Sequence, residues 1–148
     1  MSTYTKIIYH IVFATKNRLP LLTDPLRENF YRYTSGIIKN KKGYLYRING
    51  VEDHVHILTS LHPTNSLSDF IKDIKVGSSM WIKDHPLGQN FIGWQDGYGA
   101  FTHSITDQDR LINYINNQQE HHRKKTYVEE LKEMLHRAGI NFNEKYLT

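Results

Sequence analysis

The chain has 148 residues, of which 39% are hydrophobic and 23% are charged, and none is cysteine. This length predicts one domain over residues 1–148 with a real hydrophobic core, and the composition excludes wholesale disorder. The absence of cysteine excludes a disulfide scaffold, an iron–sulfur centre, a cysteine nucleophile and a thiolate zinc site. Any bound metal must therefore use His, Asp, Glu, Asn or Gln side chains.

The formal net charge of +4 is unevenly distributed along the chain. Residues 1–50 hold nine basic and two acidic side chains, a net of +7, whereas residues 51–148 hold ten basic and thirteen acidic ones, a net of −3. A basic first third favours a polyanionic partner, although a solvated surface would give the same pattern. The sequence predicts neither a membrane-spanning helix nor a signal peptide, and we expect a cytoplasmic protein.

The first predicted elements are a strand, a helix and two further strands. Residues 7–13 are apolar on both faces, which is typical of a buried central strand. A helix is predicted from Asp24, a good N-cap residue, to a stop at Gly43. Alternation of side chains then predicts strands over residues 44–51 and 54–61.

The second half of the chain adds a helix, a strand and two more helices. We expect a helix between Ser66 and His85, a strand over residues 100–104, a third helix from near Thr106 and a last helix after Thr126. The first six elements match an α+β fold, the ferredoxin-like split βαβ sandwich (βαββαβ), with two additional C-terminal helices. This fold hosts many functions and does not by itself identify one.

The strongest chemical signal is the motif His54-Val55-His56 inside a predicted strand. Side chains alternate along a strand, so His54 and His56 should share one face, about 6.5–7 Å apart along the backbone. Two imidazoles on one rigid face suit a metal site. Two hydrogen-bonded histidines on a half-exposed sheet would give the same short pattern.

A second signal lies on the predicted third helix. Tyr114 and Gln118 are four residues apart, so they should lie on one helix face, and His121 continues that stripe. A helix packed on the sheet could hold Tyr114 and Gln118 over the two histidines. Alone, the same pattern is typical of an amphipathic surface helix.

A third signal combines basic and aromatic side chains. Basic groups bind phosphates, and the aromatic faces of Trp94, Tyr98 and Phe101 could stack on unpaired bases. Core aromatics and solvated lysines would account for the pattern equally well. The candidate nucleic-acid contacts are Lys16, Arg18, Lys72, Lys75, Arg123 and Lys124.

Together these motifs resemble the single-tyrosine HUH transposases of the insertion-sequence TnpA type, which include the REP-associated tyrosine transposases. The family is named for a His–bulky apolar–His motif, which His54-Val55-His56 fits. The resemblance covers nearly the whole chain. Its segments are YHIVFATK at residues 9–16, GVEDHVHIL at 50–58, KVGSS at 75–79, WQDGYG at 94–99 and YINNQ at 114–118.

The resemblance implies a role for each member of the motifs. His54 and His56 would bind a divalent cation, Mg²⁺ or Mn²⁺, with Gln118 as third ligand. Tyr114 would attack a phosphodiester in single-stranded, hairpin-forming DNA, giving a 5′-phosphotyrosine link and a free 3′-OH. The six basic residues would contact the DNA, the protein would be nucleoid-associated when bound, and it would form a homodimer with a shared sheet.

Two imidazoles and an amide carry no negative charge, so we expect weak metal binding unless the DNA contributes a phosphate. Glu52 and Asp53 should point elsewhere or support the ligands from behind. Whether Tyr114 serves the histidines of its own chain or of a partner is open.

Two other functions also remain open at this point. One is a non-catalytic nucleic-acid-binding domain, a relic or domesticated transposase. The other is a small metal hydrolase in which His54 and His56 activate water and Tyr114 is dispensable.

Overall fold

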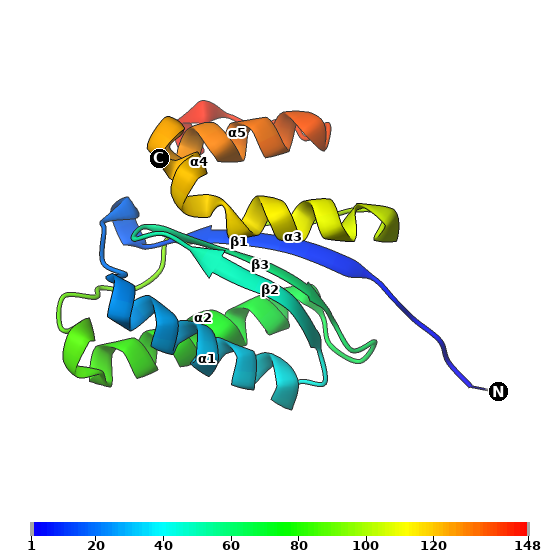
Figure 1. The fold of residues 1–148 in the computed structure, drawn as a ribbon, viewed down its shortest axis with the longest axis horizontal. Coiled ribbons are helices and arrows are strands. Elements are labelled where there is room, and N and C mark those ends of the chain that lie inside the picture. The colour runs from blue at the N-terminus through cyan, green and yellow to red at the C-terminus, as the bar shows by residue number, and fades with distance from the viewer. Residues whose placement is uncertain (1, 148) are drawn as a thin grey trace.

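A four-stranded antiparallel sheet with helices on both sides forms the centre of the protein in a computed structural model that describes residues 2–147 (Figure 1). The strands follow the order β2-β3-β1-β4 across the sheet. Their bounds are Ile8–Ala14 for β1, Tyr44–Gly50 for β2, His54–Ser60 for β3 and Gly99–Thr102 for β4. This order confirms the predicted ferredoxin-like split βαβ arrangement.

Two long helices cover one face of the sheet, and the C-terminal helices lie on the other (Figure 1). The first pair is α1 (Asp24–Asn40) and α2 (Leu67–Asp84). The second group is α3 (Gln108–Asn116), α4 (Gln118–Lys124) and α5 (Tyr127–Arg137). Among the described residues, no helix is both long and apolar enough to cross a membrane.

The predicted third helix is in fact two helices. The prediction placed Tyr114 and Gln118 on one continuous helix, but the helical hydrogen bonding breaks at Asn117, whose φ and ψ are −97° and 22°. Tyr114 therefore belongs to α3 and Gln118 begins α4. The chain changes direction between them, so their proximity does not come from simple helical spacing.

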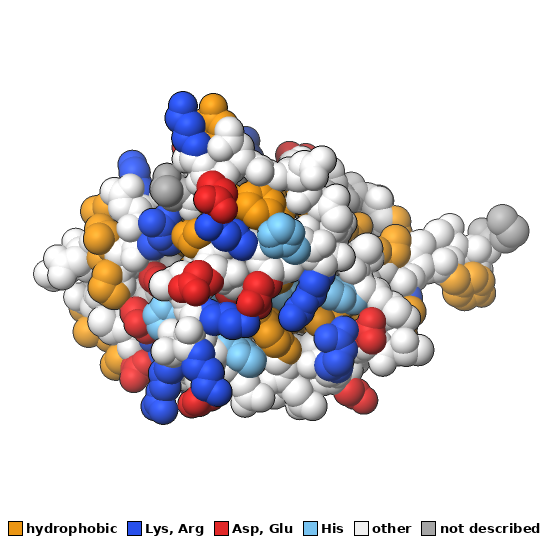
Figure 2. Space-filling view, turned by 90° about the horizontal axis from the view of Figure 1, so that it is seen from above, with side chains coloured by type: hydrophobic (Ala, Val, Ile, Leu, Met, Phe, Trp, Pro, Cys, Tyr) orange, Lys and Arg blue, Asp and Glu red, His pale blue; other side chains and the backbone are white. Residues whose placement is uncertain are grey.

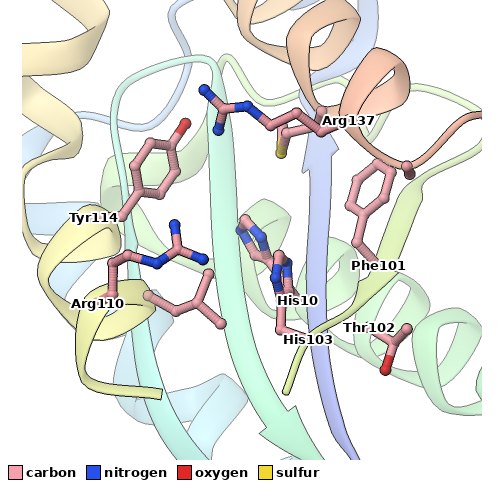
Figure 3. A pocket seen from close by; sticks show the side chains of 10 residues that line it. His10, Phe101, Thr102, His103, Arg110, Tyr114 and Arg137 are labelled. Carbon is pink, nitrogen blue, oxygen red and sulfur yellow. The ribbon is translucent and has the colours of Figure 1, made fainter. Parts of the chain in front are cut away.

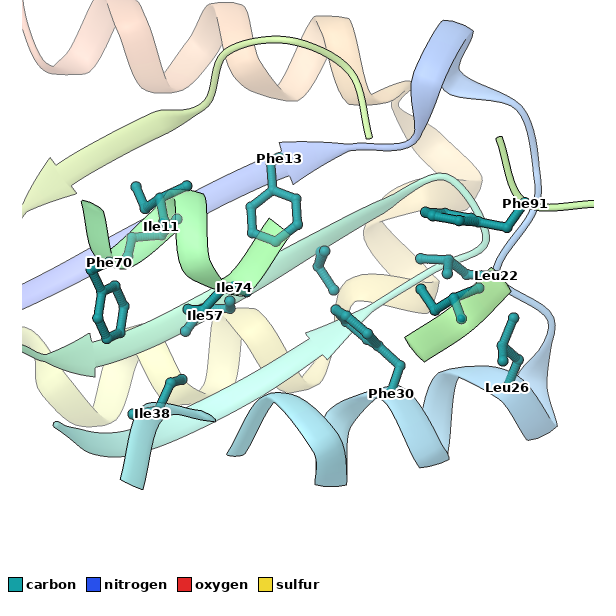
Figure 4. Close-up of a cluster of buried hydrophobic side chains, with 13 residues drawn as sticks. Ile11, Phe13, Leu22, Leu26, Phe30, Ile38, Ile57, Phe70, Ile74 and Phe91 are labelled. Atoms are coloured by element: carbon teal, nitrogen blue, oxygen red, sulfur yellow. The ribbon is translucent and has the colours of Figure 1, made fainter. Parts of the chain in front are cut away.

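The face under α1 and α2 is mainly apolar (Figure 4). Odd-numbered side chains of β1 and β3 point to this face, as the predicted alternation requires. They pack against inward-facing side chains of α1 and α2 in one continuous core. Its buried members include Ile11, Phe13, Leu26, Phe30, Val55, Ile57, Phe70, Ile71 and Ile74.

The opposite face carries two smaller apolar clusters with polar side chains between them. Leu58 packs with Ile115 of α3, and Val12 packs with Met134 of α5. Val12 of β1 pairs with His56 of β3, so the even-numbered histidines of both strands point to this face. The fold thus buries His54 and His56 under the C-terminal helices rather than leaving them half-exposed.

A tight connection between β2 and β3 fixes the position of His54. The backbone N–H of Val51 donates to the carbonyl of His54 at 3.0 Å. A Cβ at Gly50 would lie 2.4 Å from the same carbonyl oxygen, so this approach requires glycine. The hairpin therefore starts β3 at the residue that opens the His-x-His motif.

Candidate active site

Four polar side chains meet in the buried layer between the sheet and the C-terminal helices. His54 and His56 come from β3, Gln118 from α4 and Glu130 from α5. Each is at most 2% exposed. Gln118 Oε1 lies 3.2 Å from His54 Nε2, and Glu130 Oε1 lies 2.6 Å from His56 Nε2 and 3.9 Å from His54 Nε2. The fold thus brings together the predicted ligands and adds a carboxylate.

Each histidine of the motif is held from behind through its other ring nitrogen. His54 Nδ1 lies 2.7 Å from Asp53 Oδ1, and His56 Nδ1 lies 2.8 Å from His10 Nε2 on the neighbouring strand. In the tautomers in which the Nδ1 atoms carry these protons, both Nε2 atoms are left as acceptors. Such hydrogen bonds behind an imidazole orient it as a metal ligand. Asp53 thus has the supporting position expected of it.

The Nε2 atoms face oxygen atoms that are themselves acceptors. Apart from their contact with each other, the buried Nε2 atom of His56 and Oε1 atom of Glu130 have no hydrogen-bond partner among the described residues, and the buried amide nitrogen of Gln118 has none. The donor atoms of His54, His56 and Glu130 all lie within 4.8 Å of one another. A cation between them would satisfy two imidazole nitrogens, an amide oxygen and a carboxylate oxygen at once. The residues therefore fit a small divalent ion such as Mg²⁺ or Mn²⁺.

The electrostatics of the cluster favour neutral imidazoles and an ionised carboxylate. Burial lowers the pKa of His56 and, more strongly, that of His10. Burial alone would raise the pKa of Glu130, but the contact with His56, the nearby His54 and the Tyr114 hydroxyl lower it to about 2. Neutral imidazole and ionised carboxylate are the forms that bind metal ions.

Tyr114 lies beside this cluster within the same chain. Its ring is 5.9 Å from that of His56 and 6.3 Å from that of His10, and it stacks on His121. Burial and the Glu130 charge raise the pKa of Tyr114 far above the ordinary value of 10. The side chain is therefore a protonated phenol, within hydrogen-bonding reach of Glu130 and Gln118. Within this chain, therefore, the tyrosine and the two histidines lie close together.

A pocket of about 300 Å³ opens on the Tyr114 side of the cluster (Figure 3). Arg110 lies one turn before Tyr114 on α3, and Arg137 reaches over from the end of α5. His10 and His103 form part of the wall. The pocket thus joins a hydroxyl to two guanidinium groups, a set of side chains suited to an anionic ligand.

Four of the six predicted nucleic-acid contacts flank the turn that precedes His54. Lys16 and Arg18 lie on a short turn after β1, where Thr15 N–H donates to the Asp53 carbonyl at 2.9 Å. Arg123 and Lys124 end α4, next to His122, whose Nε2 lies 3.3 Å from Glu52 Oε1. Figure 2 shows that basic and acidic side chains are mixed on the face of the C-terminal helices. Contacts at particular side chains are therefore expected rather than a uniformly basic surface.

The other two predicted contacts lie on α2, on the far side of the sheet. Lys72 is exposed there. Lys75 donates from Nζ to the carbonyls of Gln95 and Gly97 at 2.8 and 2.5 Å, and burial lowers its pKa. Its ammonium group thus anchors the loop of residues 93–99, which precedes and enters β4. Contact of Lys72 or Lys75 with DNA stays a prediction.

The three aromatic candidates have different environments. Trp94 packs edge-on against Phe13 in the α1/α2 core, and its Nε1 donates to Ser78 Oγ at 3.0 Å. Phe101 lines the Tyr114 pocket, whereas Tyr98 is 42% exposed. Trp94 is therefore a core residue, Phe101 is 8% exposed and packs in the apolar cluster under α5, and of the three only Tyr98 offers an exposed face to a base.

Sequence reasoning missed Glu130, His10, Arg110 and Arg137. One signal for Glu130 was present, because Tyr127, Glu130 and Met134 recur at helical spacing after the Thr126 cap and form the buried face of α5. His10 shares a sheet face with His56 only through strand pairing between residues 46 positions apart. No local pattern could have revealed that pairing.

Comparisons with known proteins point to one family of transposases. The model of the family described as "Transposase IS200 like" matches residues 3–118. The ISDra2 transposase TnpA of Deinococcus radiodurans is 24% identical over 115 residues, which is 74% of this chain and 82% of that protein.

Two solved structures share the fold. A crystal structure of a candidate transposase from Deinococcus radiodurans R1 superposes with a TM-score of 0.59 at 25% identity, covering 80% of this chain and 95% of that one. A REP-associated tyrosine transposase bound to a REP hairpin superposes with a TM-score of 0.62 at 15% identity, covering 82% and 74%.

Proposed function

The chain belongs to the family of IS200-like transposases, and from this membership we propose that it is a metal-dependent strand transferase for single-stranded DNA. In this proposal residues 1–148 act as one domain, with Tyr114 as nucleophile and His54, His56 and Gln118 as metal ligands. The observation that carries it is the meeting of these four side chains in one chain, with the Tyr114 and His56 rings 5.9 Å apart.

The reaction exchanges one phosphate ester for another. The Tyr114 oxygen attacks the phosphorus, the bond from phosphorus to the 3′ oxygen breaks, and the phenol gives up its proton while the leaving oxygen takes one up. The products are a 5′-phosphotyrosine and a free 3′-OH. Attack by a 3′-OH reverses the step and releases Tyr114, so rejoining needs no nucleotide cofactor.

When bound, Mg²⁺ or Mn²⁺ supplies electrostatic stabilisation to the charge that develops on the phosphoryl oxygens. His54, His56 and Gln118 would hold the ion, with Asp53 and His10 keeping the imidazoles in orientation. The buried Nε2 of His56 and the position of Gln118 Oε1, 3.2 Å from His54 Nε2, support this assignment. Their burial also keeps competing water away from the reacting groups.

Arg110 and Arg137 supply the positive charge next to the nucleophile. Both line the pocket that Tyr114 borders, and guanidinium groups bind phosphate in a fork geometry. We assign them to the phosphates that flank the scissile bond. Lys16, Arg18, Arg123 and Lys124 would hold the strand farther out, around the turn before His54.

The substrate would carry a hairpin, and the protein would act as a homodimer. One related structure contains a REP hairpin, which motivates the choice of a hairpin-bearing strand. The homodimer follows from the family resemblance, although the catalytic set is complete within one chain. Light scattering with and without the hairpin measures the stoichiometry, and a 1:1 complex of monomer and hairpin would contradict the dimer.

Covalent capture tests the proposed function. The protein is incubated with Mn²⁺ and a hairpin-bearing single strand, then denatured and separated by size. Wild type should give a DNA-linked species that Tyr114→Phe abolishes. The matched control is Tyr33→Phe on the far side of the sheet, where the ring stacks on Trp81. Absence of any adduct, or an adduct that survives Tyr114→Phe, would contradict the proposal.

One observation favours the non-catalytic alternative, because His54, His56 and Gln118 are each 0% exposed beneath the helices. A binding domain without chemistry would tolerate such burial. His54→Ala separates the two functions: loss of cleavage with retained hairpin binding supports the transferase. Equal binding and no cleavage by wild type would support the alternative, and DNA hydrolysis that persists in Tyr114→Phe would indicate a metal hydrolase.

A further inference from the structure

Glu130 is the side chain of the cluster that neither the motifs nor the proposed function uses. It lies on α5 and is only 2% exposed, in a helix whose other buried members are the apolar or aromatic Tyr127 and Met134. An ionised carboxylate is rarely buried unless it is paired or binds a metal. Its surroundings therefore require an explanation.

The nearest partners of Glu130 are the proposed metal ligands. Its Oε1 lies 2.6 Å from His56 Nε2 and 3.9 Å from His54 Nε2. Apart from this close contact, that oxygen and His56 Nε2 have no hydrogen-bond partner among the described residues. In the tautomer in which His56 Nδ1 donates to His10, Nε2 directs a lone pair at the carboxylate oxygen, so the two atoms are well placed to share a cation.

A cation is the partner that the donor set implies. His54, His56 and Gln118 offer three neutral donors, which would bind Mg²⁺ or Mn²⁺ weakly. A carboxylate adds the negative charge and the hard oxygen that these ions prefer. With this carboxylate, the ion would have one negatively charged ligand from the protein even before DNA binds.

The helix that provides Glu130 lies beyond the segment that the family model matches, which ends at residue 118. The Thr126–Glu129 capping box fixes the start of α5. Tyr127 anchors the same turn, with its ring 4.9 Å from that of His54. The register of α5 therefore points the carboxylate into the site.

We propose that Glu130 is a fourth protein ligand of the catalytic cation, supplied by the C-terminal helix to His54, His56 and Gln118. The proposal rests on the proposed function of these three residues as metal ligands. It makes α5 a part of the metal centre rather than only a cover over it. The competing interpretation is that Glu130 occupies the ion's place as a latch, which a metal would have to displace.

Direct measurement of metal binding separates these interpretations without requiring catalysis. Free Mn²⁺ is titrated by electron paramagnetic resonance against DNA-free full-length wild type, Glu130→Gln and the control Glu133→Gln. Glu133 lies on the same helix but is exposed and pairs with Lys125. We expect Kd for Mn²⁺ to rise at least about 10-fold in Glu130→Gln and to stay unchanged in Glu133→Gln.

Each outcome has a distinct meaning. Wild-type affinity in Glu130→Gln, or tighter binding as a latch requires, would overturn the fourth ligand and leave the proposed function intact. Absence of Mn²⁺ binding by wild type would overturn the metal site of the proposed function itself. Circular dichroism checks folding, and if Glu130→Gln does not fold, Glu130→Asp carries the test: binding equal to wild type would overturn the proposal, and weaker binding would support it.

Discussion

The two faces of the sheet use the same strands for opposite purposes. Odd-numbered residues of β1 and β3 form a dry apolar core with α1 and α2. Even-numbered residues of the same strands place His10, His54 and His56 under the C-terminal helices, beside Gln118 and Glu130. Because side chains alternate along a strand, one rigid framework both stabilises the fold and orients the polar cluster.

The difference between the two faces shows how the fold remains stable with a buried polar cluster. Unpaired buried polar atoms cost free energy, and the described unpaired atoms concentrate on the face of the C-terminal helices. The face of α1 and α2 must supply the stability that offsets this cost. Substitutions on the two faces should therefore separate stability from chemistry.

The largest expected effect is on the apolar face. Phe30 is fully buried and contacts Trp94, so Phe30→Ala should lower the free energy of unfolding by about 3–5 kcal/mol. Urea denaturation measures the loss. Below the unfolding transition the adduct yield per folded molecule should remain close to that of wild type. A loss under 1 kcal/mol would contradict the role assigned to this core.

At Gln118 we expect the opposite result, a loss of activity without a large loss of stability. Gln118→Met fills a similar volume and removes an unbonded amide nitrogen together with Oε1, which lies 3.2 Å from His54 Nε2, so the free energy of unfolding should change by no more than about 1 kcal/mol. The rate of adduct formation should fall about 100-fold or more, because a metal ligand is lost. Denaturation and single-turnover assays on the same preparation make the comparison. A large loss of stability with retained activity would reverse the assignment of this face.

Substitutions of Lys75 and Lys16 test which basic residues bind DNA. Lys75→Met leaves the carbonyls of Gln95 and Gly97 without their donor, so it should cost about 1–3 kcal/mol of stability, and its salt slope of hairpin binding tests the predicted DNA contact. Lys16→Met should leave stability unchanged and lower the salt slope of DNA binding by about one. A reduced slope in Lys75→Met would place DNA on the α2 side as well.

The smallest expected effect is at Asp53, whose carboxylate contacts the ring nitrogen of His54 that faces away from Gln118 and Glu130. Asp53→Asn removes the charge that holds His54 Nδ1, so Mn²⁺ binding should weaken about 10-fold. Asp73→Asn on α2 is the matched control, because this exposed carboxylate pairs with Lys41 instead. Calorimetric titration measures both. Equal affinity of the two variants would show that Asp53 does not orient the ligand.

Local patterns predicted the element order and the shared face of His54 and His56. Both depend on short-range rules, namely the alternation of a strand and the caps of helices. The break at Asn117 was missed because residues 114–121 read as one amphipathic helix. The position of Gln118 beside His54 arises only because the chain turns at Asn117, between α3 and α4, while both helices pack in the folded protein.

The remaining site residues depend on long-range pairing. His10 reaches His56 through the register of β1 and β3, and Glu130 reaches it through the docking of α5. The spacing of Tyr127, Glu130 and Met134 identifies a buried helix face, but it does not say what that face covers. Local patterns therefore predicted the His-x-His motif, whereas the carboxylate beside it could be found only from the fold.

Mapping of the covalent link tests the central claim most directly. The adduct of wild type with a hairpin-bearing strand and Mn²⁺ is digested with trypsin and nuclease, and the nucleotide-bearing peptide is sequenced by mass spectrometry. Tyr127 is the competing tyrosine, because its ring also contacts His54. We predict a 5′-phosphoryl link on Tyr114. A link on Tyr127, or no link to protein while the strand is cut, would contradict the account.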